Sequence, residues 1–439
     1  MTVLLALIAA LPFALGCPEP AHAPDTPAGE QLEWFLAALA GEDPGDIEAR
    51  FHSSFNEQVP PAQLKATLTR IGAMGPFTLV AIESRDDPMS LRAILYAENA
   101  DANFRVLINI DEPTGRVTGL LIQPAPDFGA QPITTWEEFD ELLAELPGRV
   151  SFGVYELIDG RPDAVHEYNA DVALPIGSTF KLWILGALGE LVLEGQASWD
   201  EPLAIDDSLK SLPSGEMQVY DAGTEFPISE FADKMISISD NTATDHLLAR
   251  IGRERVEGYM SRFVADPAPN KPLIGTYEMF ALKLGGNREL LLRYAGADEA
   301  ERRELLDGPV AKTTPIQVLI LAWKRPIEIE RVEWFAGARD LAATMADLRR
   351  LEQIDGLGPL GRALRINAGI AFDREVWTGI AFKGGSEPGV INMTWMVERD
   401  DGRWFVLSLG WADTESAVAL EQAVRLATRG FGLTADQRR

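Results

Sequence analysis

The sequence contains little cysteine and little histidine, which limits its chemistry. One cysteine, Cys17, occurs among 439 residues, and there are four histidines. A single cysteine allows no disulfide within the chain and no cysteine-based metal site. No group of His, Asp and Glu has the spacing of metal ligands, and no glycine-rich loop has the spacing that binds phosphate. The sequence therefore predicts neither a metal nor a cofactor.

Positive charge is also sparse. Lys and Arg number 39 against 67 Asp and Glu, so the formal net charge is −28. This balance argues against nucleic acid and anionic lipid as partners, because both repel an acidic protein. The acidic residues are spread along the chain, and we interpret them as a solvated surface. Hydrophobic residues make up 46% of the chain, which is typical of a soluble globular protein, and the length predicts two domains.

The first seventeen residues are almost entirely apolar and give way abruptly to Pro18-Glu19-Pro20. This run, residues 1–17, is too short to span a bilayer comfortably and is typical of a secretory signal, which predicts an exported, periplasmic or extracytoplasmic protein. Ala14-Leu15-Gly16-Cys17 resembles a bacterial lipoprotein box, with Ala14 where Leu is usual. Two interpretations stay open: Cys17 is lipidated and tethers the protein to a membrane, or the leader is simply cleaved.

A first domain is expected at residues 29–124, after a Pro/Ala-rich linker at 18–28. Its pattern is helical from Glu30 to Gly75 and then strand-like at Phe77–Ser84, Ser90–Glu98, Asn103–Ile110 and Val117–Gln123. This order predicts an α+β domain, and it resembles the cone-shaped fold of nuclear transport factor 2 and its relatives. No catalytic constellation stands out in it, so we interpret it as a structural or docking module.

The larger domain is expected at residues 135–432, after a second linker at 125–134. Its elements are predicted as helix and strands, then helices, then strands and a closing helix: Trp136–Leu146, Val150–Ile158, Val165–Val172, Leu182–Val192, Ile228–Met235, Thr242–Ile251, Glu333–Leu351, Val376–Lys383, Gly389–Glu398, Trp404–Trp411 and Glu415–Leu426. The two groups of strands must meet to form one core. We therefore expect Lys383 to lie beside the helix that follows Ser178.

Three short motifs carry the chemistry of this domain. They are Ser178-x-x-Lys181, Ser239-Asp240-Asn241 and Lys383-Gly384-Gly385-Ser386. A serine hydroxyl is a poor nucleophile until a base removes its proton, and a lysine one turn away can do so if burial or a neighbouring cation lowers its pKa. An isolated Ser-x-x-Lys pair is usually accidental. Two lysines and two serines brought into one pocket instead favour a catalytic function, since like charges depress the pKa of one lysine.

The three motifs, in this order and with their flanking residues, resemble the class A β-lactamase and penicillin-binding-protein family of serine hydrolases. The resemblance covers about residues 148–428. It implies an antiparallel sheet with flanking helices and an all-helical subdomain, so the fold class of the chain is α/β + α+β. The small domain ahead of it resembles a narrower two-domain group that includes a clavulanic-acid-pathway protein and mycobacterial lipoproteins, with weak β-lactamase and attributed esterase activity.

The resemblance implies a role for each matched residue. Ser178 would be the nucleophile, Lys181 would take its proton, and Ser239 would relay a proton to the leaving group. Lys383 would bind a substrate carboxylate and tune the other groups. The remaining matched residues would bind substrate: Asn241, Gly384, Gly385 and Ser386. The oxyanion hole would be the backbone N–H of Ser178 and that of Gly385 or Ser386.

Two departures from the family pattern bear on the activity. Gly384 stands where the family usually has Thr or Ser, so a hydroxyl that would contact the substrate carboxylate is missing unless Ser386 replaces it. The Glu-x-x-Leu-Asn loop that supplies the deacylation base of class A β-lactamases is not found, and Glu278 is only a weak candidate for that base. Slow turnover of penicillins is therefore expected. A histidine triad is disfavoured, because His52, His166 and His246 lie far from the motifs or inside predicted elements.

These observations predict a serine hydrolase that acts through an acyl-enzyme. Its substrate would be a small ester or amide bearing a carboxylate, such as a β-lactam, an ester or a peptidoglycan-like fragment. Two alternatives stay open. One is a true β-lactamase that hydrolyses penicillins and cephalosporins, and the other is a penicillin-binding or sensor module that is acylated without turnover.

Overall fold

The computed structural model describes residues 22–84, 87–100, 102–125, 133–315, 322–370 and 372–436. The chain divides into two compact units, residues 1–131 and 132–439. The predicted leader with Cys17 and parts of both predicted linkers lie outside the described residues. None of the helices in the described part of the chain combines the length and apolarity that a membrane span requires.

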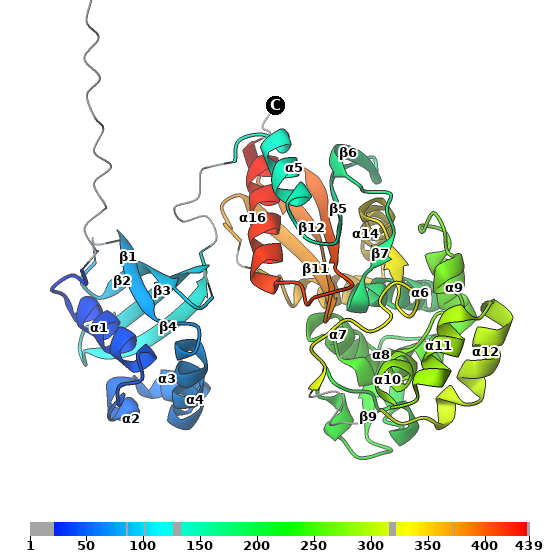
Figure 1. Ribbon diagram of the computed structural model, residues 1–439, viewed down its shortest axis with the longest axis horizontal. Helices are drawn as coiled ribbons and strands as arrows, with labels where there is room; N and C mark the ends of the chain where they lie inside the picture. The colour runs from blue at the N-terminus through cyan, green and yellow to red at the C-terminus, as the bar shows by residue number, and fades with distance from the viewer. Residues whose placement is uncertain are drawn as a thin grey trace, which may run out of the picture. The chain divides into compact units, whose positions relative to one another are not determined.

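The first unit places helices before an antiparallel sheet of order β1-β2-β3-β4 (Figure 1). Its elements are α1 (Pro27–Leu39), α2 (Ile47–Arg50), α3 (Ser53–Gln58), α4 (Pro61–Gly72), β1 (Phe77–Ser84), β2 (Ser90–Ala97), β3 (Ala102–Asp111) and β4 (Arg116–Pro124). The predicted four-stranded meander is thus confirmed. Its core joins α1 to the sheet through Leu32, Phe35, Val106 and Ile108. The likeness to nuclear transport factor 2 stays a prediction.

The second unit is built on a five-stranded antiparallel sheet of order β11-β12-β13-β5-β6. The strands are β5 (Arg149–Ile158), β6 (Arg161–Tyr168), β11 (Trp377–Glu387), β12 (Val390–Arg399) and β13 (Trp404–Ala412). The two predicted groups of strands therefore form one sheet through the pairing of β13 with β5. β11 lies at the edge of this sheet, and Lys383 lies within it, opposite Thr394 of β12.

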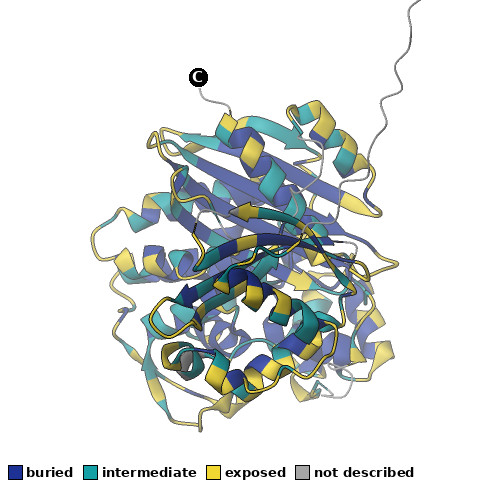
Figure 2. Cartoon of the chain, turned by 90° about the vertical axis from the view of Figure 1, so that its left-hand side faces the viewer, coloured by how far each residue is buried: buried dark blue, intermediate teal, exposed yellow. Residues whose placement is uncertain are grey.

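Helices cover both faces of this sheet. On one face pack α5 (Trp136–Ala144) and α16 (Leu420–Asp436), against side chains such as Phe152, Trp395 and Leu407. The other face meets the helical part of the unit: α6 (Lys181–Leu193), α7 (Ile228–Ser237), α8 (Asn241–Ile251), α9 (Arg253–Met260), α10 (Thr276–Leu284), α11 (Arg288–Gly296), α12 (Glu299–Asp307), α14 (Ala338–Glu352) and α15 (Gly358–Arg365). Figure 2 shows the sheet strands largely buried and the outer faces of the helices exposed.

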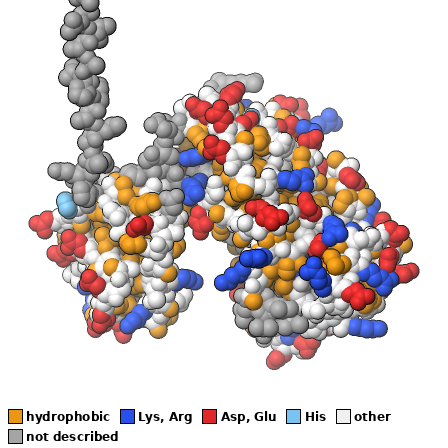
Figure 3. Space-filling view, viewed as in Figure 1, with side chains coloured by type: hydrophobic (Ala, Val, Ile, Leu, Met, Phe, Trp, Pro, Cys, Tyr) orange, Lys and Arg blue, Asp and Glu red, His pale blue; other side chains and the backbone are white. Residues whose placement is uncertain are grey.

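Short elements connect these layers. Two small sheets pair β7 (Leu174–Pro175) with β10 (Phe335–Ala336) and β8 (Pro202–Ala204) with β9 (Glu225–Pro227). The 3-10 helices are η1 (Gly177–Phe180), η2 (Asp207–Leu209), η3 (Met217–Val219), η4 (Ala268–Asn270) and η5 (Val310–Lys312). On the face drawn in Figure 3, acidic and basic side chains are interspersed, as expected for a solvated surface.

The structure differs from the predicted elements in three places. The strand predicted at Val165–Val172 begins four residues earlier and is β6 (Arg161–Tyr168), whose place is set by its pairing with β5. The helix predicted from Glu333 begins instead at Ala338, because Phe335 and Ala336 pair with β7. The closing helix begins at Leu420, five residues after its predicted start. The first two differences arise where pairing with a neighbouring strand decides a boundary that apolar periodicity cannot locate.

Candidate active site

One cavity of about 460 Å³ contains residues from all three sequence motifs. Ser178 comes from η1, Ser239 from the loop between α7 and α8, and Lys383 to Ser386 from β11. These segments are 61 and 144 residues apart in the chain (239 − 178 and 383 − 239). The fold thus brings together, at the edge strand of the sheet, the motifs that the sequence predicted to be neighbours.

Two glycines allow η1 to lie directly on β11. Gly177 has φ +49°, and a Cβ added to it would lie 2.9 Å from the nitrogen of Ser386. A Cβ added to Gly385 would lie 2.1 Å from the carbonyl oxygen of Ile176 and 2.4 Å from the nitrogen of Ser178. Side chains at either position would push the two backbones apart. The backbone nitrogens of Ser178 and Ser386 therefore both lie where η1 contacts β11.

An aromatic stack fixes η1 from the other side. The rings of Phe180 and Trp334 are parallel within 3° at 3.8 Å between centroids. Both side chains are buried, and the indole N–H of Trp334 donates to the carbonyl oxygen of Ile274 at 2.9 Å. Packing of this kind holds the turn that carries Ser178 against a rigid core.

Lys181 is fully buried and directed at the second motif. Its ammonium nitrogen Nζ donates to the carbonyl oxygen of Ser239 at 2.7 Å, to Ser239 Oγ at 3.1 Å and to Asn241 Oδ1 at 2.8 Å. Burial lowers the pKa of Lys181 well below its ordinary value, and the charge of Lys383 lowers it further. A lysine in this state can be a neutral base near neutral pH.

Ser239 lies between the two lysines. Its hydroxyl accepts a hydrogen bond from Lys181 and another, also 3.1 Å long, from Nζ of Lys383. Its backbone has φ +58°, a strained left-handed conformation for a serine. The hydroxyl of Ser214 donates to its carbonyl oxygen at 2.7 Å and helps to hold that conformation.

Lys383 is 2% exposed and also donates to the carbonyl oxygen of Gly384. Burial lowers its pKa to about 7. Near neutral pH, Lys383 is therefore divided between a cation that can bind a carboxylate and a neutral amine. Gly384, Gly385 and Ser386 follow it along the cavity, and the Ser386 side chain is exposed.

The hydroxyl of Ser178 has no hydrogen-bond partner among the described residues, and the three acceptors of Lys181 do not include it. We expected that contact from the spacing of the two residues. Lys181 is instead hydrogen bonded to oxygen atoms of the second motif. Hydrogen bonds between catalytic groups often tighten only when substrate binds, so a rotation of either side chain would be needed for proton transfer.

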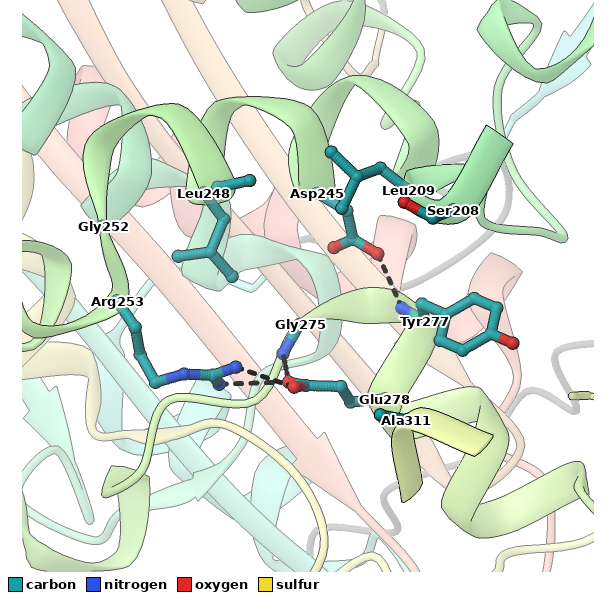
Figure 4. Close-up of a pocket in the computed structure, with 11 residues that line it drawn as sticks. Ser208, Leu209, Asp245, Leu248, Gly252, Arg253, Gly275, Tyr277, Glu278 and Ala311 are labelled. Carbon is teal, nitrogen blue, oxygen red and sulfur yellow. Dashed lines mark hydrogen bonds and ion pairs between the residues drawn. The ribbon is translucent and has the colours of Figure 1, made fainter. Parts of the chain in front are cut away.

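Glu278, the weak candidate for the deacylation base, does not line the cavity of Ser178. Its carboxylate forms an ion pair with Arg253, 2.7 Å from Oε1 to Nη2, and Oε2 accepts from the nitrogen of Gly275 at 2.6 Å (Figure 4). It lines a different cavity, of about 400 Å³. Its spacing in the chain resembled that of a catalytic Glu, whereas its function here is to cap α10.

No acidic or histidine side chain is found among the described residues that line the Ser178 cavity. His166 contacts Asp140 and stacks on Trp136, while His246 donates to the carbonyl oxygen of Thr242. His52 caps α3 in the first unit. In the described part of the chain there is also no group of three or more His, Cys, Asp or Glu that could hold a metal.

Two residues that shape this site were not expected from the sequence. Ser214 was not singled out from the sequence, and Asp240 was treated only as the middle residue of a motif. The buried Asp240 carboxylate accepts from the nitrogens of Glu216, Met217 and Ala243 at 2.6, 2.8 and 2.8 Å. It thereby ties the Ser214 loop to the start of α8. The Asp-x-x-Ala N-cap pattern could have indicated the last of these bonds, but nothing local indicated the others.

Comparisons with known proteins agree with the two-unit architecture. Residues 134–267 match the family described as the β-lactamase enzyme family, and residues 23–113 match one described as the ORF 12 gene product N-terminal region. No curated protein sequence matches the chain.

Solved structures similar to the chain include that of PBP-A, with 18% identity, a TM-score of 0.44 and coverage of 69% of this chain and 97% of that chain. A β-lactamase from Sphaerobacter thermophilus has 17% identity, a TM-score of 0.46 and coverage of 67% and 94%. The class A β-lactamase from Mycobacterium abscessus has 17% identity, a TM-score of 0.46 and coverage of 67% and 98%.

The segment that matches the first family contains Ser178, Lys181, Ser239 and Asn241. The predicted resemblance is therefore confirmed for the part of the chain that carries two of the three motifs. Residues 134–267 of the second unit are similar to the β-lactamase enzyme family, and this match supports the chemistry of a serine hydrolase.

Proposed function

We propose that this protein is an exported serine hydrolase that forms an acyl-enzyme at Ser178 from a small ester or amide bearing a carboxylate. The observation that carries the proposal is the buried lysine pair around Ser239, in the cavity that Ser178 lines. Burial and the charge of Lys383 lower the pKa of Lys181, so this lysine can act as a base without a histidine. The family match supports the reaction class but not the substrate.

Acylation would begin with proton transfer from the Ser178 hydroxyl to the neutral amine of Lys181. Ser178 Oγ would then form a bond to the substrate carbonyl carbon, and the carbonyl π electrons would move to its oxygen. The backbone N–H groups of Ser178 and Ser386, which border one close contact, would donate to this oxyanion. Preorganised donors of this kind typically contribute about 3 kcal/mol each to lowering the barrier.

Collapse of the tetrahedral intermediate would break the bond to the leaving nitrogen or oxygen. That atom needs a proton, and the Ser239 hydroxyl can supply one while taking another from Lys181, to which it is hydrogen bonded. The protonated form of Lys383 would hold the substrate carboxylate. The products of this half-reaction are a free amine or alcohol and the Ser178 ester.

For deacylation, the described residues of the cavity include no carboxylate or imidazole that could act as a general base. Because no Asp, Glu or His lines it in the described part of the chain, Lys181 or Ser239 would have to activate the attacking water. We therefore propose slow turnover of β-lactams and faster turnover of esters, whose acyl groups leave less hindered intermediates. The same observation favours one further candidate, a penicillin-binding or sensor module that stays acylated.

Intact-mass spectrometry tests the proposal. The protein would be incubated with benzylpenicillin and, separately, with a cephalosporin that carries an acetyl ester. A mass gain on wild-type protein that is absent from Ser178→Ala, and that decays over time, supports the hydrolase. A gain that persists indicates the non-turnover module, and rapid penicillin hydrolysis indicates a true β-lactamase. If neither compound gave a mass gain or was hydrolysed, acylation at Ser178 would be contradicted.

Export and a membrane tether through Cys17 belong to the same proposal. They are supported by the apolar run of residues 1–17 and by the box that ends at Cys17. Cell fractionation of the native chain, compared with Cys17→Ala, would test both: a tethered protein moves from the membrane fraction to the soluble exported fraction in the variant.

A further inference from the structure

The cavity that contains Ser178 extends around the edge of the sheet. Lys383 and Gly385 point to the face that meets the helical part of the unit, whereas Phe382 and Gly384 alternate to the opposite face. The lining residues Phe382, Ile391 and Met393 belong to the core on that opposite face. The same cavity therefore contacts both faces, which is possible because β11 is an edge strand.

Gly384 is the position at which the two parts of the cavity join. Gly384 pairs in register with Met393, so a side chain at position 384 would lie next to Met393 on the same face of the sheet. A Cβ added to Gly384 would lie 2.8 Å from Cζ of the Phe382 ring. The ring cannot easily withdraw, because a Cβ on Gly369 would lie 2.6 Å from it on another side and it packs 4.9 Å from Trp395. Glycine at 384 therefore keeps the passage open.

The far part of the cavity is apolar. Its side chains include Phe382, Met393 and Leu420, the last of which is 54% exposed. The described polar side chains there are already hydrogen bonded within the protein: the Asn367 amide nitrogen donates to the carbonyl oxygen of Ser237 and its oxygen accepts from the nitrogen of Gly369, both at 2.8 Å, and the Ser237 hydroxyl donates to the carbonyl oxygen of Asp233 at 2.6 Å. Such a surface offers few free partners to a charged or hydrogen-bonding group, whereas an apolar group would be removed from water on it.

We propose that the substrate carries an extended apolar arm, such as a medium-length alkyl or acyl chain, which crosses Gly384 and lies against Phe382, Met393 and Leu420. This inference rests on the proposed hydrolase function and names its substrate class. Gly384 is then a specificity-determining residue. Glycine at this position provides no hydroxyl to contact the substrate carboxylate, but it leaves room for a substrate to reach the apolar subsite.

Two ester pairs test the inference on both sides of the scissile bond. p-Nitrophenyl acetate and octanoate vary the acyl group, and methyl and octyl acetate vary the alcohol. Each methylene buried is worth about fourfold in binding, so in at least one pair we expect kcat/KM to be about tenfold or more higher for the longer ester. Gly384→Thr should lower that preference about tenfold, and Leu420→Ser, at an exposed position, should lower it without a change in the core.

Ile366→Ser is the matched control, because Ile366 is 52% exposed and does not line the cavity. It should leave the preference unchanged. The inference would be overturned if wild-type kcat/KM were the same for the short and the long ester in both pairs, or if the preference for the longer ester were unchanged in Gly384→Thr and Leu420→Ser. In either case, ester turnover that depends on Ser178 would still support the proposed hydrolase.

A binding measurement keeps the inference testable if no ester is turned over. Octanamide and acetamide would be titrated into the wild-type chain and Gly384→Thr by calorimetry. Octanamide binding that is about tenfold weaker in the variant, with no measurable acetamide binding to either protein, supports the apolar subsite. Equal octanamide binding to both proteins, or none to the wild type, contradicts it.

Discussion

At the scale of single residues, the site depends on how burial changes two lysines. Lys181 and Lys383 both contact Ser239 Oγ, and burial is the largest cause of the lowered pKa of each. Coulombic repulsion between them lowers the pKa of Lys181 further. One amine can thus act as a base while the other keeps partial positive charge.

The pKa of about 7 at Lys383 predicts how substrate choice changes with pH. Lys383 is mainly a cation below pH 7 and mainly neutral above it, so affinity for a substrate carboxylate should fall as pH rises through 7. The ratio of kcat/KM for an anionic ester to that for its uncharged analogue should drop about tenfold between pH 6 and pH 8. Taking a ratio cancels the pH dependence of Lys181, which both substrates share.

Steady-state kinetics on such an ester pair would measure this ratio. Lys383→Met should give a low ratio that does not vary with pH. A wild-type ratio that stays constant between pH 6 and pH 8 would show that Lys383 does not select the carboxylate.

At the scale of elements, α8 is attached to its surroundings by Asp240. This buried N-cap accepts one hydrogen bond from the helix, at Ala243, and two from the loop at Glu216 and Met217. Loss of its carboxylate would leave three backbone N–H groups without a partner, and the residues on either side, Ser239 and Asn241, both contact Lys181.

We therefore expect Asp240→Ala to lower the free energy of unfolding by about 3 kcal/mol and to lower kcat/KM as well. Asp298→Ala is the matched control, since Asp298 caps the exposed α12 with a single bond to the nitrogen of Glu301; it should cost about 1 kcal/mol and leave kcat/KM unchanged. Urea denaturation and ester kinetics on both variants would check this. Equal effects of the two substitutions on stability would argue against a special role for Asp240.

At the scale of the whole molecule, the two units have separate cores. The core residues of the first unit all come from residues 28–117, and both large cores of the second unit come from residues 139–433. Each unit can therefore bury its apolar surface without the other. The residues that line the Ser178 cavity all belong to the second unit.

A chain that begins at residue 132 should thus fold cooperatively and be acylated at Ser178 at a rate within about twofold of the full chain. Circular dichroism during heating would measure folding, and intact-mass spectrometry would measure acylation. Failure to fold, or a large loss of acylation by folded protein, would mean that the first unit contributes to the site.

Local patterns predicted much of this structure. Alternating apolar residues predicted the strands of both units, and the Pro/Gly break before Lys181 predicted where the helix after Ser178 begins. The three motifs predicted which side chains share a cavity. By contrast, the sequence placed Glu278 by its distance along the chain, which contains no information about direction, and its carboxylate pairs with Arg253 instead.

The sequence by itself determined the chemical groups of the site, the order of the elements and the glycines that permit close backbone contact. Only the tertiary structure decided that Lys181 is bonded to Ser239 and Asn241 rather than to Ser178, that Asp240 joins two loops, and that Gly384 opens onto an apolar surface. The physical reason is that hydrogen bonds and cavities depend on residues brought together from distant parts of the chain, whereas periodicity and motif spacing report only on neighbours.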